Sequence, residues 1–299
     1  MSKNIIIRIA LLALVAFQPI ANADSLRDRL KELRDRNRPA KQEPQPAPNN
    51  ASASEEKEFK IPPIGPIPLE DEVRLGRQIA GNLLGAAPLV KDDMLQQYVN
   101  RVGRWVALQS DRPDLKWTFG VIQTDDINAF AAPGGYVFIT RGLYATLKDE
   151  GELAGVLGHE IAHVQQKHHL KVLQKSQLLD MGANILKKRV DKGGSAAQRI
   201  IGSGAEIFSR GLDKDAEFEA DRLGVILAAR AGYDAWGLPS VLQEISAVSS
   251  SDNAVGMLFK THPHPDERLS RLADAMGERL DSLKTSDNGK GRFYKLAAK

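Results

Sequence analysis

Two histidines and a glutamate stand close together inside an otherwise apolar stretch of the chain. His159, Glu160 and His163 form an H-E-x-x-H motif within residues 153–164, where every other residue is leucine, valine, isoleucine, alanine or glycine. A stretch of this composition is normally buried, and burying an ionisable group costs free energy unless a partner compensates it. Three such groups within five residues therefore indicate one common partner.

The spacing of the motif fits a metal ion. Residues four apart lie on one face of a helix, one turn from each other, so both imidazoles can reach the same ion. Zinc is the usual choice for two neutral imidazoles, and Glu160 can take a proton from a metal-bound water and pass it to a leaving amine. A chance H-E-x-x-H is the alternative, at roughly one chain in a hundred of this histidine content. The apolar helical setting favours one zinc ion per chain.

A catalytic zinc needs a third protein ligand. His169 stands where the longer H-E-x-x-H-x-x-G-x-x-H pattern has its last histidine. Gln166 replaces the glycine that lets the chain turn back, and Lys167 follows, so we expect the helix to continue. Continued helix would carry His169 about 9 Å along the axis from His163. We therefore expect His169 at the surface, and His168 also unless it packs against the helix end.

Two carboxylates downstream offer a better ligand. Glu217 and Asp221 lie one turn apart on a helix predicted over residues 215–231. Glu217 is the candidate third ligand, and Asp221 could hydrogen-bond the far nitrogen of a ligating histidine and fix its tautomer. Glu219 points elsewhere and is expected to be solvated. The alternative is a row of acidic side chains at an exposed helix start, which the H-E-x-x-H motif disfavours.

The last two histidines lie in a proline-stiffened loop, THPHPDER, at residues 261–268. His262 is a candidate catalytic residue, either donating a hydrogen bond to the tetrahedral intermediate or binding the metal as a fourth ligand that shuts the site. The alternative is a loop histidine that caps a helix or faces water, and this is the interpretation we favour for His264.

Hydrophobic periodicity predicts the elements that position these residues. Strands clustered before a mostly helical remainder predict an α+β fold. We expect helices at 70–84 and 92–109, a half-buried strand at 116–123, two strand-like runs around the turn 133–135, the motif helix entered through acidic residues 149–152, helical stretches to about 209, the helix at 215–231 and a last helical set after 234.

The first 68 residues predict export and a linker. Residues 1–23 carry Lys3 and Arg8, a short apolar run and an A-x-A end, which is typical of a cleaved signal peptide; an uncleaved membrane anchor is the alternative. Residues 24–68 contain a short charged helix and then eight of the fifteen prolines, which indicates an extended linker.

Composition excludes several classes of protein. The chain has no cysteine, so it has no disulfides and no lipidated cysteine. Its net charge is only +3, of which the predicted signal peptide contributes two, so we expect no nucleic-acid partner. No later stretch has 18 consecutive apolar residues, so we expect no transmembrane span in the mature chain, and we expect the periplasm as its location.

Four segments together resemble metallopeptidase family 48, which includes the CAAX prenyl protease and periplasmic proteases of outer-membrane quality control. They are NAFAAPGGYVFITRGL, ELAGVLGHEIAHVQQKH, the E-x-x-x-D of Glu217 and Asp221, and THP at 261–263. The resemblance covers residues 69–275, and we expect these residues to form a zinc metallopeptidase domain. A C-terminal tail at residues 276–299 is expected to follow it.

The resemblance implies a zincin-like fold, mostly helical with a small sheet. It also implies zinc held by His159, His163 and Glu217, with Glu160 as general base. An edge strand bordering the groove would pair with an extended substrate through Asn128, Ala129, Phe130 and Ala131, since an exposed edge captures any peptide backbone.

The chain is most similar to the soluble periplasmic branch of the family. We therefore expect a metalloendopeptidase that cleaves extended or unfolded polypeptides among misfolded or stalled envelope proteins, with the outer-membrane protein assembly machinery as a partner. One rival is a latent protease acting mainly as a chaperone or assembly factor, which the variant Glu160→Gln would separate from an active protease. Another is a metal-dependent hydrolase of a different bond, such as a cell-wall amidase.

Overall fold

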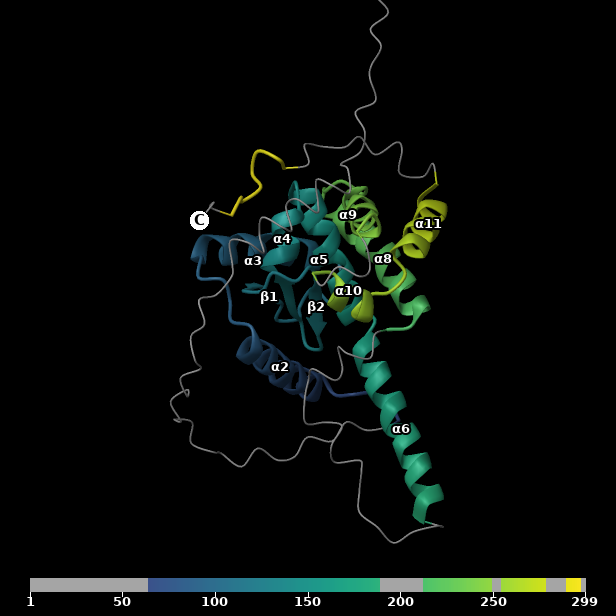
Figure 1. Ribbon diagram of the computed structural model, residues 1–299. Helices are drawn as coiled ribbons and strands as arrows, with labels where there is room; N and C mark the ends of the chain where they lie inside the picture. Colours follow the sequence, from purple (N-terminus) through teal and green to yellow (C-terminus); the bar gives the residue numbers. More distant parts are fainter. Residues whose placement is uncertain (1–63, 189–211, 249–253, 278–288, 297–299) are drawn as a thin grey trace, which may run out of the picture.

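The computed structural model describes residues 64–188, 212–248, 254–277 and 289–296 (Figure 1). The predicted signal peptide, the charged helix and nearly all of the proline-rich linker lie outside these residues, as does the stretch 189–209. No helix in the described part is long and apolar enough to cross a membrane.

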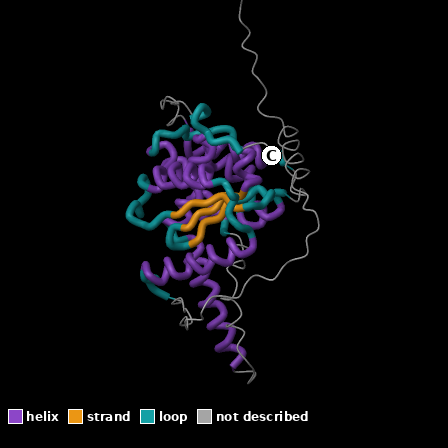
Figure 2. The backbone as a smooth tube through the Cα atoms, turned by 90° about the vertical axis from the view of Figure 1, so that its left-hand side faces the viewer, coloured by secondary structure: helices purple, strands orange, loops and turns teal. Residues whose placement is uncertain are grey.

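A three-stranded mixed sheet forms the centre, between helices on both sides (Figure 2). Its order is β1-β3-β2, with β1 (Thr118–Ile122) parallel to β3 (Tyr136–Thr140) and β2 (Ala129–Ala132) antiparallel to β3. Gly134 and Gly135 in the turn between β2 and β3 have φ angles of 79° and 94°, a region that glycine tolerates without strain. The predicted strands are confirmed, and β2 lies at an edge.

The described part of the chain contains nine helices, and together with the sheet they confirm the predicted α+β fold. They are α2 (Leu69–Ala86), α3 (Asp93–Ala107), α4 (Arg141–Thr146), α5 (Glu150–Gln165), α6 (His168–Lys188), α8 (Lys214–Arg230), α9 (Gly237–Ser246), α10 (Gly256–Thr261) and α11 (Pro265–Met276).

Helices cover both faces of the sheet. Phe119 and Val121 of β1 join the main core with α3 and α5, whereas Ile122, Phe130 and Phe138 pack with α2 on the other face (Figure 1). The expectation of a half-buried first strand was therefore wrong, because α2 covers the face that would otherwise meet water.

The motif helix α5 runs through the middle of the molecule, and all its residues from Glu150 to Val164 are buried. Asp149 caps it by accepting a hydrogen bond from the backbone N–H of Glu152. At its crossing with α8, a Cβ on Gly158 would lie 2.7 Å from the backbone oxygen of Gly224. The two glycines thus bring the backbones of α5 and α8 close enough for their side chains to share one site.

The chain turns sharply after the motif, so the predicted continuation of the helix was wrong. Helix α5 ends at Gln165, Lys167 adopts a left-handed φ of 57°, and α6 starts at His168. The Nζ of Lys167 lies 3.6 Å from a carboxylate oxygen of the buried Glu72, which helps to hold this turn. As a result His169 is buried, not at the surface as expected, and His168 is buried against His163 near the end of α5, which was the alternative left open for it.

Residues 289–296 pack on the first turns of α3 and α5. Phe293 is buried and stacks on Tyr144 at a centroid distance of 5.3 Å. Tyr294 donates its hydroxyl to Asp92, the N-cap of α3, and Arg292 donates to Glu150. This segment therefore ties the end of the chain to the core.

Candidate metal centre

The two motif histidines point their Nε2 atoms at each other from one face of α5. These atoms are 2.9 Å apart. The carboxylate of Glu217, from the first turn of α8, lies 3.6 Å from Nε2 of His159 and 3.5 Å from Nε2 of His163. With His262 from the end of α10, these residues form a buried group whose possible ligand atoms all lie within 4.8 Å of one another.

The donor set fits a divalent metal ion. Nδ1 of His159 is 2.9 Å from Asp221, and because an ionised carboxylate only accepts hydrogen bonds, this contact selects the tautomer with its proton on Nδ1 and its lone pair on Nε2. Burial and the neighbouring His159 hold the pKa of His163 well below its ordinary value, so its imidazole is neutral. Two ligand nitrogens of a tetrahedral zinc site lie about 3.3 Å apart, close to the separation found here.

An arginine that the sequence interpretation did not single out supports both carboxylates. Arg268 of α11 is buried and donates to both oxygens of Asp221, at 2.8 and 2.6 Å, and its Nη1 lies 3.1 Å from Glu217. The signal available in the sequence was indirect, since two buried carboxylates on one helix face require a compensating cation.

The surrounding charges keep these carboxylates ionised. Burial alone would raise the pKa of Glu217, but His262 and Arg268 lower it to about 2. Burial alone would also raise the pKa of Asp221, but Arg268 together with His159 brings this pKa well below its usual range. The site therefore presents two negative charges near neutral pH.

Glu160 lies beside the metal-binding group and is also buried. Its Oε1 is 3.8 Å from Nε2 of His262, and its Oε2 has no hydrogen-bond partner among the residues that the structure describes. Burial raises the pKa of this carboxyl, and the opposing effects of His262 and His159 are smaller. A carboxylate with a raised pKa is a stronger base than an exposed one, as a general base requires.

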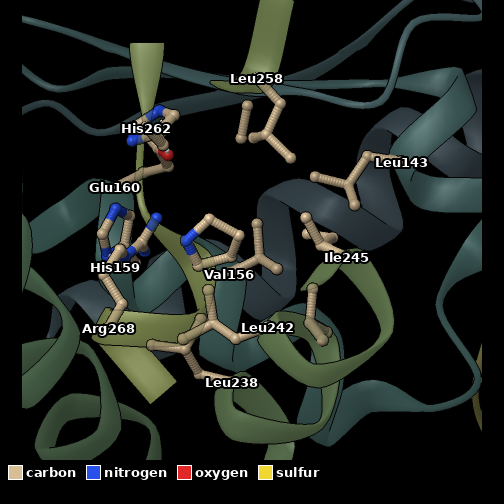
Figure 3. A pocket seen from close by; sticks show the side chains of 13 residues that line it. Leu143, Val156, His159, Glu160, Leu238, Leu242, Ile245, Leu258, His262 and Arg268 are labelled. Carbon is tan, nitrogen blue, oxygen red and sulfur yellow. Dashed lines mark hydrogen bonds and ion pairs between the residues drawn. The ribbon is translucent and has the colours of Figure 1, made fainter. Parts of the chain in front are cut away.

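An apolar cavity opens next to Glu160 (Figure 3). His159, Glu160 and His262 stand on one side of it, and aliphatic side chains from α9 and its neighbours stand on the other. Its apolar lining includes Leu143, Val156, Leu238, Leu242, Ile245 and Leu258. The cavity thus offers space for an apolar group within reach of the candidate base.

A model of peptidase family M48 matches residues 93–276, more than half of the chain. The chain belongs to peptidase family M48. The matched region runs from α3 to α11 and contains every residue of the metal-binding group.

This M48 chain is similar in sequence to three named relatives. It is 30% identical over 236 residues to the beta-barrel assembly-enhancing protease of Yersinia pestis, covering 77% of this chain and 48% of that protein. It is also 30% identical over 211 residues to the protein of the same name from Escherichia coli (strain K12), covering 68% of this chain and 43% of that protein. The mitochondrial metalloendopeptidase OMA1 of Schizosaccharomyces pombe is 28% identical over 191 residues, covering 64% of this chain and 56% of that protein. The chain spans about half the length of the curated relatives it matches.

The edge strand of this M48 chain borders the site, because Ala129 lines the cavity together with Glu160. The oxygen of Asn128 accepts from the N–H of Thr140, so in the antiparallel ladder Ala129 and Ala131 direct their peptide groups away from β3. Asn128, Ala129 and Ala131 are buried as whole residues, main chain included, and the N–H of Ala129 donates to the side-chain oxygen of Asn128. The exposed edge expected from the sequence is therefore covered in this structure.

The other candidate residues from the sequence, His262, His264 and Glu219, differ in their distance from the metal-binding group. His262 is buried, its Nδ1 lies 3.1 Å from Glu217, and its ring is therefore part of the metal-binding group. His264 is exposed and sits at the N-cap of α11. Glu219 is half-exposed as expected, but its carboxylate also lies 3.2 Å from Nε2 of His168, a contact that the helix pattern alone did not indicate.

Proposed function

We propose that this chain is a zinc metalloendopeptidase of the periplasm that cleaves extended or unfolded polypeptides. The observation that carries the proposal is the placement of Glu160 beside four buried ligand-type side chains, His159, His163, Glu217 and His262. Membership of family M48 and relatives with protease names support the same reaction.

Each residue has a distinct task in this reaction. His159, His163 and Glu217 would hold the zinc, which when bound supplies a Lewis acid that polarises the scissile carbonyl and the attacking water. Glu160 takes the proton of the attacking water and delivers it to the leaving amine, and its raised pKa suits both transfers.

His262 supports two versions of the mechanism. Burial lowers its pKa, but the carboxylates of Glu217 and Glu160 together raise the pKa above its ordinary value, so the ring is a good hydrogen-bond donor for an oxyanion. Its position in the metal-binding group equally supports a fourth ligand that keeps the enzyme latent. The second version favours a protease that acts mainly as a chaperone or assembly factor until His262 moves away.

The surroundings of the site support unfolded chains as substrates. The edge of β2 borders the cavity, and a peptide that displaces its present cover would pair with its main chain irrespective of sequence. The apolar cavity beside Glu160 can receive an aliphatic or aromatic side chain, and such side chains are exposed in misfolded proteins and buried in folded ones.

The cellular setting rests on the N-terminal sequence and on the relatives. Residues 1–23 have the pattern of a signal peptide, and two relatives are named for beta-barrel assembly. We therefore place the substrates among misfolded or stalled envelope proteins, with the outer-membrane protein assembly machinery as the partner.

The first experiment is casein cleavage by residues 24–299, compared with Glu160→Gln, with zinc content measured for both proteins. We expect about one zinc per chain in each protein and cleavage by the wild type alone. If neither protein holds zinc, or if the variant cuts as well as the wild type, the proposed function is wrong.

The latent version predicts a different pattern, in which both proteins hold zinc and neither cuts. In that case His262→Ala should cleave casein, because removing the fourth ligand opens a coordination position. A zinc-loaded His262→Ala protein that still fails to cut would remove the latent protease from consideration.

A further inference from the structure

A chain of polar contacts leads from the second motif histidine to the surface, and the proposed mechanism does not use it. Nδ1 of His163 lies 2.9 Å from Nδ1 of His168, and Nε2 of His168 lies 3.2 Å from Oε2 of Glu219. His163 is fully buried, His168 is nearly so, and the side chain of Glu219 is 39% exposed. The three residues come from α5, α6 and α8.

The contacts allow only one arrangement of protons when His168 is neutral. An ionised Glu219 can only accept, so Nε2 of His168 carries the proton and its Nδ1 is the acceptor. Nδ1 of His163 must then donate, and Nε2 of His163 keeps the lone pair that faces Glu217. This is the tautomer that a metal ligand at Nε2 requires.

We propose that His168 and Glu219 are positioning residues that fix the tautomer and ring orientation of His163 for metal binding. The inference rests on the metal site of the proposed function and adds two residues to it. His159 obtains the same support directly, from the carboxylate of Asp221. For His163 an imidazole is inserted between the ligand and the carboxylate.

The backbone turn after the motif is what makes this arrangement possible. Because Lys167 is left-handed, the first residue of α6 folds back, and the ring of His168 meets that of His163 at a centroid distance of 5.1 Å and an angle of 70°. A non-glycine residue at this φ is uncommon and costs free energy. Burying an imidazole also costs free energy unless it is hydrogen-bonded. A leucine would fill the same space without this cost, so packing alone does not account for a histidine at position 168.

Zinc affinity of purified full-length variants tests the inference, measured by competition with a chromophoric chelator. His168→Leu keeps most of the side-chain volume and removes both nitrogens, and we expect it to bind zinc about 10–100-fold more weakly. His168→Asn places an amide oxygen near the position of Nδ1, so we expect it to recover most of the lost affinity. Cobalt(II) substitution should show an altered visible absorption spectrum for His168→Leu, because the ligand ring is no longer held.

Glu219 provides a test at a half-exposed position, where a variant is expected to fold. Glu219→Ala should weaken zinc binding by about tenfold, at the lower end of the same range, whereas Glu219→Gln retains an acceptor oxygen and should bind nearly as well as the wild type. Asp215→Asn is the matched control, since it removes an exposed charge from the first turn of the same helix.

The inference is overturned if His168→Leu and Glu219→Ala bind zinc as tightly as the wild type and leave the cobalt spectrum unchanged. A loss of thermal stability in the metal-free proteins alone would then assign these residues to packing. This outcome is distinct from failure of the proposed function, in which the wild type itself would hold no zinc or cleave no casein.

Discussion

Two buried carboxylates at the centre of this molecule, those of Asp221 and Glu217, face one guanidinium group. Arg268 is the main cation in this balance, because its guanidinium reaches both Asp221 and Glu217. Removing one partner of such a buried group leaves the other charge uncompensated, which is far more costly than losing a pair at the surface. The residues that would hold the metal are therefore also the ones on which local stability depends.

Replacing Arg268 by methionine tests this balance. In the metal-free protein we expect the free energy of unfolding to fall by about 3–5 kcal/mol, because Asp221 and Glu217 lose their counter-charge. Urea unfolding in the presence of a chelator measures the change. Arg271→Met, at an exposed position of the same helix, is the control and should lower the stability by no more than about 1 kcal/mol, because it loses only a cation–π contact with Phe218. Equal stability of the two variants would contradict this account.

The motif residues could be predicted from the sequence, and Arg268 could not. H-E-x-x-H fixes two ligands and a base through helix geometry alone, so His159, Glu160 and His163 follow from spacing. Arg268 lies 47 positions from Asp221 on a different helix, and no local pattern connects them. His169 was misplaced for a related reason: a lysine at position 167 gives no signal of the left-handed turn that ends the motif helix.

At the scale of elements, periodicity predicted the helices and strands well, because each buries a definite face. The pattern of β1 could not reveal that α2 also covers its second face, since this contact joins segments far apart in the chain. Likewise, the cavity beside Glu160 arises from α4, α5, α9 and α10 together and from no single segment.

The cavity gives a prediction about substrate choice. Leu242→Phe adds bulk to the α9 wall, so cleavage of peptides with a large apolar residue beside the scissile bond should lose about tenfold in kcat/KM. Peptides with alanine at the same position should be affected much less. The measurement compares kcat/KM for a matched pair of peptides.

Leu95→Phe is the control for this variant, because it adds the same bulk to the buried face of α3, away from the cavity. It should leave the ratio between the two peptides unchanged. If Leu242→Phe lowers both peptides equally, the cavity does not receive a substrate side chain.

At the scale of the whole molecule, the described part of the C-terminal segment belongs to the core. Phe293→Ala should lower the free energy of unfolding by about 3–5 kcal/mol, since the ring is buried between Tyr98 and Tyr144. Urea unfolding of the full-length protein measures this. Lys295→Ala, at an exposed position of the same segment, should have almost no effect; a similar loss in both variants would argue against docking of the ring.

Metal binding joins three separate parts of the chain, which gives a final prediction. The candidate ligands come from α5, α8 and the end of α10, so only the folded chain can assemble them. A ligand that binds the folded state alone stabilises it by about 2.7 kcal/mol at a free concentration 100 times its dissociation constant. For a domain of this size each kcal/mol shifts Tm by about 2–4 °C, so zinc should raise Tm by about 5–11 °C.

Thermal unfolding with zinc and with chelator measures this shift. Glu160→Gln should show the full shift, because this residue is not among the candidate ligands, whereas His163→Ala should lose most of it. A wild-type Tm that is independent of zinc would mean that these side chains do not hold a metal in the folded protein. A shift of equal size in His163→Ala would instead place the bound metal elsewhere in the chain.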